Sequence, residues 1–109
     1  MDTLHVYLKR EVYGWYNQGK THELRVPVGE FAPEKIMTGK GVVLHRGNSG
    51  ITQSGNVGEV ITDSLDVILK TVDANKIAPP IKTSDELMPL VHKMLGVHDK
   101  YVCFEVILD

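Results

Sequence analysis

The sequence contains little cysteine and no long hydrophobic run, and each absence excludes a class of protein. Its 109 residues include one cysteine, Cys103, so an internal disulfide is excluded and a reducing compartment is favoured. No apolar run approaches the roughly 20 residues of a membrane-spanning helix. The first residues form neither a basic leader nor an apolar signal core. We therefore expect a cytoplasmic protein with no membrane partner.

Residues that could carry redox or metal chemistry are sparse. Cys103 lies in the apolar run 101–108, which predicts a packed thiol, because reactive thiols occupy exposed, electropositive surroundings. The histidines show neither the H-E-x-x-H pattern nor a cluster with cysteine. They are His5, His22, His45, His92 and His98. We expect no metal site and no cofactor.

Neither sign of charge is in large excess, since the net charge is −2. A weakly acidic chain is not a strong polyanion binder, so contact with nucleic acid should be local and sensitive to salt. The charge is uneven along the chain. Residues 1–46 contain seven Lys or Arg and five Asp or Glu, whereas residues 47–109 contain five and nine. The first part is therefore the better place for an anionic ligand.

One short motif suggests nucleotide hydrolysis, but its surroundings do not fit. Residues 14–21 match G-x-x-x-x-G-K-S/T, the phosphate-binding loop that lies between a buried strand and a helix. Here the order is reversed. Val12, Trp15 and Tyr16 recur at helical spacing before the motif ends, and the residues after it alternate as in a strand. Gly19 is therefore predicted to end a helix with a positive φ angle.

Hydrophobic periodicity and turn residues divide the chain into short elements. We expect strands at 4–8, 21–26, 42–46, 57–61 and 102–108, helices at 10–18, 65–72 and 84–95, an irregular segment with a possible helical turn at 27–40, and a glycine-rich hairpin loop at 47–58. Short strands with few helices predict an α+β fold in a single domain, 1–109. The expected architecture is a small, partly closed mixed β-barrel of about five strands with two to three helices over its openings.

The second predicted strand carries alternating charge. Side chains alternate between faces with a period of two, so Thr21, Glu23 and Arg25 share one face. Positions 22, 24 and 26 then form the core face, and Lys20 lies at the edge of the polar one. Lys20 and Arg25 could contact a phosphate, and Glu23 could accept from an exocyclic amine or orient Arg25. A surface ion pair between Glu23 and Arg25 is the simpler alternative.

Other residues of the first half could extend this group. Tyr16 is the better candidate for stacking on a base, whereas Trp15 is expected to anchor the core because of the area it buries. Lys9 and Arg46 are candidate extensions of the positive surface. Isolated basic residues are more often simply solvated, and both interpretations stay open.

The order of these elements and the residues between them resemble the ASCH domain, a member of the PUA-like barrel superfamily. The hallmark is a helix that ends in glycine and is followed by K-x-x-E-x-R, which here is Gly19, Lys20, Glu23 and Arg25. The family usually has one more residue between the glycine and the lysine. Further similarities lie in segments 36–39, 64–79 and 84–87, so the resemblance covers nearly the whole chain.

The resemblance implies a cleft over the barrel, lined by Lys20, Glu23 and Arg25, that binds RNA or a nucleotide-like ligand. Some similar proteins are small amidohydrolases that act on acylated cytidine. They have a threonine at the position of Glu23 and a glutamate near residues 78–80, and this chain has neither. Three functions follow as hypotheses: binding of RNA or a nucleotide, hydrolysis of acylated nucleosides with Lys20 and Glu23 as catalytic groups, and a non-catalytic protein-interaction module. The sequence does not predict an oligomeric state.

Overall fold

Alternating apolar residues form five strands, and these strands pair into one mixed sheet. The computed structural model describes residues 3–109. The strands lie in the order β1 (Leu4–Leu8), β3 (Gly41–Arg46), β4 (Thr52–Asp63), β5 (Tyr101–Leu108) and β2 (His22–Arg25). β1 is parallel to β3, and the other neighbouring strands are antiparallel. β1 and β2 are therefore the two edges of the sheet.

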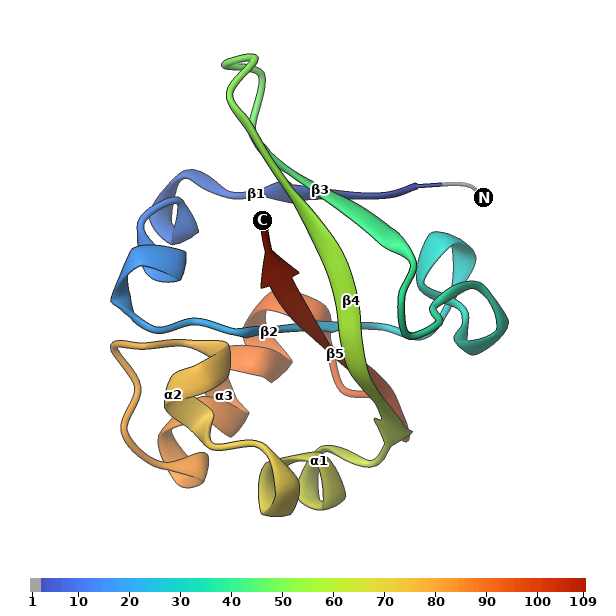
Figure 1. Cartoon of the computed structure of the whole chain (residues 1–109). Helices are drawn as coiled ribbons and strands as arrows, with labels where there is room; N and C mark the ends of the chain where they lie inside the picture. The colour runs from blue at the N-terminus through green and yellow to red at the C-terminus, as the bar shows by residue number, and fades with distance from the viewer. Residues whose placement is uncertain (1–2) are drawn as a thin grey trace.

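The sheet curves into a barrel that remains open between these edges (Figure 1). The helices α1 (Leu65–Thr71), α2 (Ala74–Ile77) and α3 (Ser84–Leu95) gather on one side, and the hairpin between β3 and β4 projects at the top. The predicted α+β fold, a partly closed mixed barrel of about five strands with two to three helices, is confirmed. No helix formed by residues 3–109 is long and apolar enough to cross a membrane.

The strand β5 separates two hydrophobic cores. Val102, Phe104 and Val106 point into the barrel, whereas Tyr101 and Cys103 face the helices. This alternation follows from the period of two along a strand. Cys103 is completely buried, and burial raises the pKa of its thiol to about 12. The predicted packed thiol is confirmed.

The helix α3 follows its sequence signals closely. Its first turn is capped by the Thr83 side chain, which accepts a hydrogen bond from the Glu86 backbone N–H at 3.2 Å. It ends at Gly96, which has a φ angle of 84°. The predicted helix 84–95 is therefore confirmed at both ends. In α1, Ser64 is the N-cap residue, and its side chain accepts a hydrogen bond from the Val67 backbone N–H.

The predicted helix 10–18 is wrong, because this segment forms two 3₁₀ turns, Arg10–Val12 and Trp15–Gln18. Gly14 separates the turns, and the aromatic residues around it have lower helix propensity than straight-chain residues. Trp15 packs against both cores, and the two short turns allow it to reach both. Gly19 ends the second turn with a φ angle of 107°, as predicted. A strand follows, so the rejection of a phosphate-binding loop is confirmed.

The predicted loop 47–58 is also too long. Only residues 47–51 connect the hairpin, and the rest belongs to β4, which is longer than the predicted strand 57–61. The reason is close packing. A Cβ atom at Gly55 would lie 2.3 Å from the backbone oxygen of Ile107, so glycine lets β4 approach β5. Glycine here serves strand pairing rather than flexibility.

We predict that Gly55→Ala lowers the free energy of unfolding by about 1–3 kcal/mol, because the backbone of β5 must shift to accommodate a methyl group. Gly41→Ala is the matched control, since its nearest atom would be the Thr3 hydroxyl oxygen at an ordinary 3.6 Å. Urea denaturation measures both variants. Equal stability of the two would contradict the close approach.

Candidate functional site

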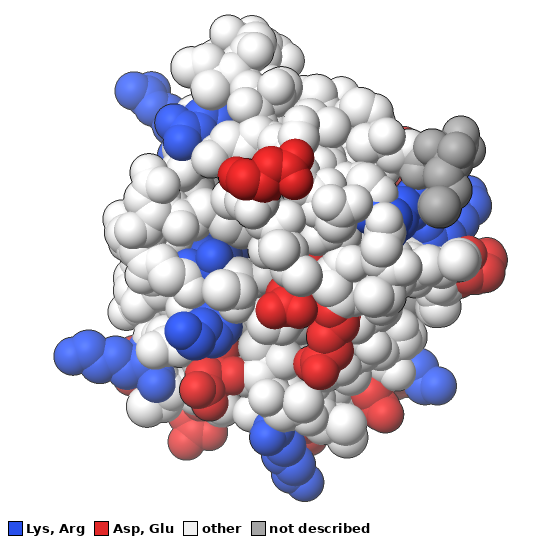
Figure 2. All heavy atoms as spheres, viewed as in Figure 1, with Lys and Arg blue, Asp and Glu red and all other residues white. Residues whose placement is uncertain are grey.

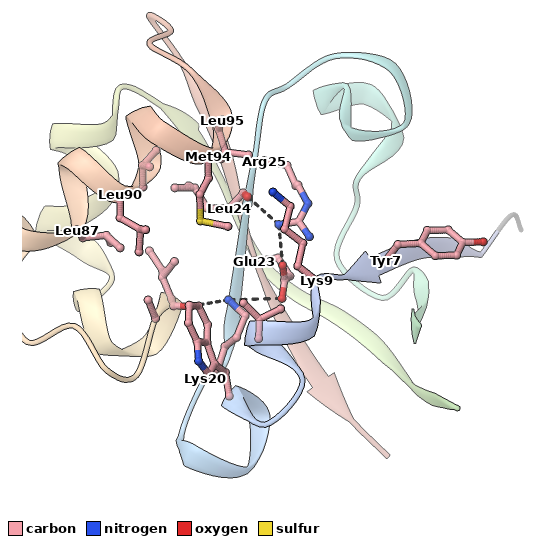
Figure 3. A pocket seen from close by; sticks show the side chains of 15 residues that line it. Tyr7, Lys9, Lys20, Glu23, Leu24, Arg25, Leu87, Leu90, Met94 and Leu95 are labelled. Atoms are coloured by element: carbon pink, nitrogen blue, oxygen red, sulfur yellow. Dashed lines mark hydrogen bonds and ion pairs between the residues drawn. The ribbon is translucent and has the colours of Figure 1, made fainter. Parts of the chain in front are cut away.

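A cavity of about 230 Å³ lies where residues of both edge strands meet the helix α3. One wall is charged and comes from the ends of β1 and β2 and from the turn before β2. The opposite wall is apolar and comes mainly from α3, as Figure 3 shows. The α3 residues that line it are Leu87, Leu90, Val91, Met94 and Leu95. The cavity is therefore amphipathic.

Backbone contacts fix the start of the charged wall. The left-handed conformation of Gly19 reverses the chain, and the Lys20 N–H then bonds to the Trp15 carbonyl at 3.0 Å. The backbone of Thr21 then forms hydrogen bonds with two other elements. Its N–H donates to the Lys76 carbonyl at 2.8 Å, and its carbonyl accepts from the Val106 N–H at 2.8 Å. The polar side chains that follow are thus held between β5 and α2.

Glu23 is the centre of the charged wall and is only 2% exposed. One carboxylate oxygen accepts from Arg25 Nη1 at 2.7 Å. The other accepts from the Tyr16 hydroxyl and lies 3.4 Å from Lys20 Nζ. Burial by itself raises the pKa of this carboxyl, but Lys20 and Arg25 outweigh burial and hold the pKa below its usual range. Glu23 is therefore an anion whose neighbours compensate its buried charge.

Lys20 is buried as well, with 7% of its surface exposed. Its ammonium donates to the carbonyls of His22 at 2.6 Å and Ile77 at 2.5 Å, besides its ion pair with Glu23. Burial lowers the pKa of Lys20, while the charge of Glu23 acts in the opposite direction. An ammonium has three hydrogens, and three acceptors surround this one. Lys20 therefore links the turn, β2 and α2 rather than reaching freely into the cavity.

Arg25 is the partly accessible member of the group, with a side chain 23% exposed. Among residues 3–109, both acceptors of its hydrogen bonds, Glu23 and the Leu24 carbonyl at 2.9 Å, use the same Nη1 atom. A guanidinium carries five N–H donors, so others remain for a ligand. The group also lies over the Phe31 ring, 5.6 Å from its centroid. Arg25 is thus oriented from two sides while facing the cavity (Figure 3).

The cavity lining carries more positive than negative charge. Three basic side chains line it, those of Lys9, Lys20 and Arg25, and one acidic side chain, that of Glu23. By contrast, the face in Figure 2 shows basic and acidic side chains interspersed. The overall net charge is −2. The cavity is therefore a local positive region on a weakly acidic protein, as the uneven charge of the sequence predicts.

The structure brings some of the predicted site residues together and leaves others apart. Glu23 and Arg25 share one strand face, as alternation predicts, and with Lys20 they line the cavity. That face points into the barrel. The alternative of a surface ion pair is therefore wrong, since Glu23 is buried on the same side as Phe104, its partner on β5. Lys9 also lines the cavity.

The remaining candidates, Tyr16, Thr21 and Arg46, are not among the residues that line the cavity. Tyr16 supports Glu23 through its hydroxyl, whereas Trp15 lines the cavity. Thr21 forms a 2.7 Å hydrogen bond with the half-buried His22 ring. Arg46 lies at the end of β3, at the base of the projecting hairpin. Within residues 3–109, no group of three or more His, Cys, Asp or Glu side chains could hold a metal ion.

The apolar wall was missed by sequence reasoning. Met94 and Leu90 follow helical spacing within 84–95, and this pattern by itself indicates only a core-facing stripe. Nothing in the spacing shows that part of the stripe faces an open cavity. The position of α3 opposite β2 decides this, and that position depends on the tertiary fold.

Comparison with known proteins supports the fold. No protein-family model and no curated protein matches the sequence. Two solved structures are similar. The crystal structure of hypothetical protein PH0355 matches with a TM-score of 0.77 and 14% identity, over 99% of this chain and 100% of that one. The crystal structure of a tyrosine-to-phenylalanine mutant of ZmASCH from Zymomonas mobilis matches with a TM-score of 0.65 and 8% identity, over 97% and 69%. The chain thus has an ASCH-like fold.

We predict that Glu23→Gln lowers the free energy of unfolding by about 3–5 kcal/mol at neutral pH, because Lys20 and Arg25 lose their buried counter-charge. Glu59→Gln, on the exposed side of β4, is the control and should change it by less than about 0.5 kcal/mol. Urea denaturation measures both.

The same pair of proteins tests the lowered pKa of Glu23. A carboxyl whose folded pKa is low contributes its stability above the ordinary value of 4.5 and loses it as pH falls toward the folded value. The difference between wild type and Glu23→Gln should therefore shrink on acidification below that value. A difference that stays constant would show that the charge of Glu23 is not what stabilises the fold.

Proposed function

We propose that the cavity binds a nucleotide-like ligand, with a phosphate at Arg25 and Lys9 and a base against α3. The observation that supports this proposal most directly is how the Arg25 guanidinium is bound. Its guanidinium is fixed by Glu23 on one side and has donors left for a ligand on the other. An arginine fork suits two phosphate oxygens at once. Because Arg25 is already oriented, less side-chain entropy is lost when the ligand binds.

The apolar wall favours a ligand with a flat hydrophobic part. Leu90 and Met94 line the cavity opposite Arg25, and methionine adapts well to the edge or face of an aromatic ring. A free inorganic anion would leave this wall without a partner, and a purely apolar ligand would leave the positive charge unmatched. A nucleobase joined to a phosphate satisfies both walls.

The ASCH-like fold adds support, since the residue pattern that resembles this family carries the expectation of an RNA or nucleotide ligand. The chain as a whole is weakly acidic, which agrees with a local contact rather than a long polyanion track. The third hypothesis, a protein-interaction module, would be favoured by a cleft blocked by a loop of the chain and by a large apolar patch elsewhere. A cavity of about 230 Å³ argues against it.

We predict that Arg25→Lys weakens the binding of cytidine 5′-monophosphate by about 10- to 100-fold, because a lysine cannot replace the two-pronged contact but keeps a cation beside Glu23. Isothermal titration calorimetry measures the affinity, and thermal unfolding checks that the fold is kept. Lys9→Ala should cause a smaller loss that diminishes at high salt. Lys70→Ala, an exposed lysine of α1, is the matched control. Unchanged affinity in Arg25→Lys would refute the phosphate contact.

A second candidate function is hydrolysis of acylated nucleosides, and the position of Lys20 favours it. Lys20 is among the residues that line the cavity, and burial lowers its pKa. A neutral amine has two hydrogens for the two backbone carbonyls and keeps a lone pair that could take a proton from water. The resulting hydroxide would add to the acyl carbon, and the amine would leave with the proton. Glu23, with its lowered pKa, is the weaker base.

If the protein is such a hydrolase, it should release acetate and cytidine from N4-acetylcytidine at a rate that rises with pH as Lys20 becomes neutral. Lys20→Met should abolish the release, and Lys76→Met is a control on a lysine outside the cavity lining. Chromatography of the nucleosides measures the reaction. No release from neutral to alkaline pH would remove this candidate and leave the binding function unaffected.

A further inference from the structure

Two histidine side chains meet on the outer face of the sheet. His5 lies on β1 and His45 on β3, and these strands run parallel and side by side (Figure 1). Buried and exposed residues alternate along β1, so His5 points away from the barrel interior. Its Nδ1 atom lies 2.8 Å from Nε2 of His45. The two residues are 40 positions apart in the chain, so no short motif indicates the pair.

The pairing of the strands fixes this approach. In the parallel register the direct partner of His45 is Tyr7, and the direct partner of His5 is Val43. The two histidines are therefore diagonal neighbours on one face, a separation that long side chains can span. The Tyr7 ring stacks on the His45 ring, with centroids 4.4 Å apart and an angle of 14° between the planes. This stacking limits the rotation of the His45 ring.

The distance between the two nitrogens suits one kind of metal coordination. An imidazole nitrogen binds a first-row transition metal at about 2.0–2.1 Å, so two nitrogens at adjacent corners of a square or an octahedron lie about 2.9 Å apart. Tetrahedral coordination needs about 3.3 Å. The observed 2.8 Å therefore matches a square or octahedral arrangement. Cu²⁺ and Ni²⁺ are the divalent ions that favour nitrogen ligands in this geometry.

The charges near the pair select against cations that need oxygen ligands. His5 also borders a second cavity, whose charged lining residues are Glu30, Lys35 and Lys40. This lining carries more positive than negative charge, so it does not attract Mg²⁺ or Ca²⁺, which bind carboxylate and carbonyl oxygens. Neutral imidazole nitrogens bind a transition metal without any negative charge.

We infer that His5 and His45 together bind one divalent transition cation of the Cu²⁺ and Ni²⁺ class, at a site separate from the cavity that α3 lines. Without the cation, one ring donates its N–H to the other. When the cation binds, this hydrogen moves to the far nitrogen of its own ring, and both facing nitrogens then present lone pairs. Water fills the remaining coordination positions. The bound cation joins the edge strand β1 to β3.

A purely structural role for the pair makes a different prediction. A hydrogen bond between two neutral rings on neighbouring strands stabilises the sheet without any cation. Its loss would lower the free energy of unfolding by the same amount with and without metal. A cation site adds stability only when the cation is bound, and it requires both histidines.

The test is a calorimetric titration of Ni²⁺ into the untagged whole protein, slightly above neutral pH. His5→Gln and His45→Gln should each weaken binding by at least about tenfold, because one of two protein ligands is lost. His92→Gln, which removes an exposed histidine of α3, is the matched control and should bind Ni²⁺ as wild type does. Mg²⁺ should not bind at this site. Electron paramagnetic resonance of bound Cu²⁺ should show two nitrogen ligands in wild type and one in each variant.

Thermal unfolding without metal checks that each variant keeps its fold. A rise in the unfolding temperature of wild type with Ni²⁺, absent in His5→Gln, would support the site. The site is refuted if wild type binds Ni²⁺ no more tightly than His5→Gln, if His92→Gln removes the binding, or if Cu²⁺ shows a single nitrogen ligand in wild type. Its failure leaves the proposed nucleotide site unaffected, because neither His5 nor His45 lines that cavity.

Discussion

The structure depends on one buried carboxylate. Glu23 points into the barrel, where a charge without partners would be too costly to keep, and its partners decide how the neighbouring elements lie. Tyr16 reaches it from the turn before β2, and Arg25 reaches it from two residues further along the strand. Lys20 adds a contact to Ile77 at the end of α2. The carboxylate thus connects the barrel with the helical layer, and the cavity lies where the two meet.

The opening of the barrel gives the cavity its two kinds of wall. β1 and β2 do not pair with each other, so polar side chains that would otherwise fill a closed barrel face the gap. The helix α3 lies across from them and offers leucine and methionine side chains. A fully closed sheet would have buried Arg25 on all sides, and a sheet without α3 would have left it in open solvent. The partial closure is therefore what combines a fixed cation with an apolar surface.

The sequence predicts the local parts of this structure well and the tertiary parts poorly. Alternation in β1 and β5, the bounds of α3 and the left-handed Gly19 are local properties, and the sequence predicted each of them. The sequence also predicts that Glu23 and Arg25 share one face of β2. It does not predict that this face points into the barrel, because a polar face is expected to point to solvent unless a network of partners compensates its charge. The long β4 and the α3 wall depend on contacts between distant segments, which no short pattern reports.

The pairing of Arg25 with Glu23 limits the kind of ligand that the proposed site would favour. Its guanidinium is already paired with Glu23, so the positive charge offered to the cavity is partly neutralised before any ligand arrives. A highly charged anion would gain less from such a group than from a free arginine, and it would compete with Glu23 for the same cation. A singly linked phosphate with a ring that packs on α3 would draw its affinity from several modest contacts. Such a division of contacts favours reversible binding of a nucleotide over tight capture of an inorganic polyanion.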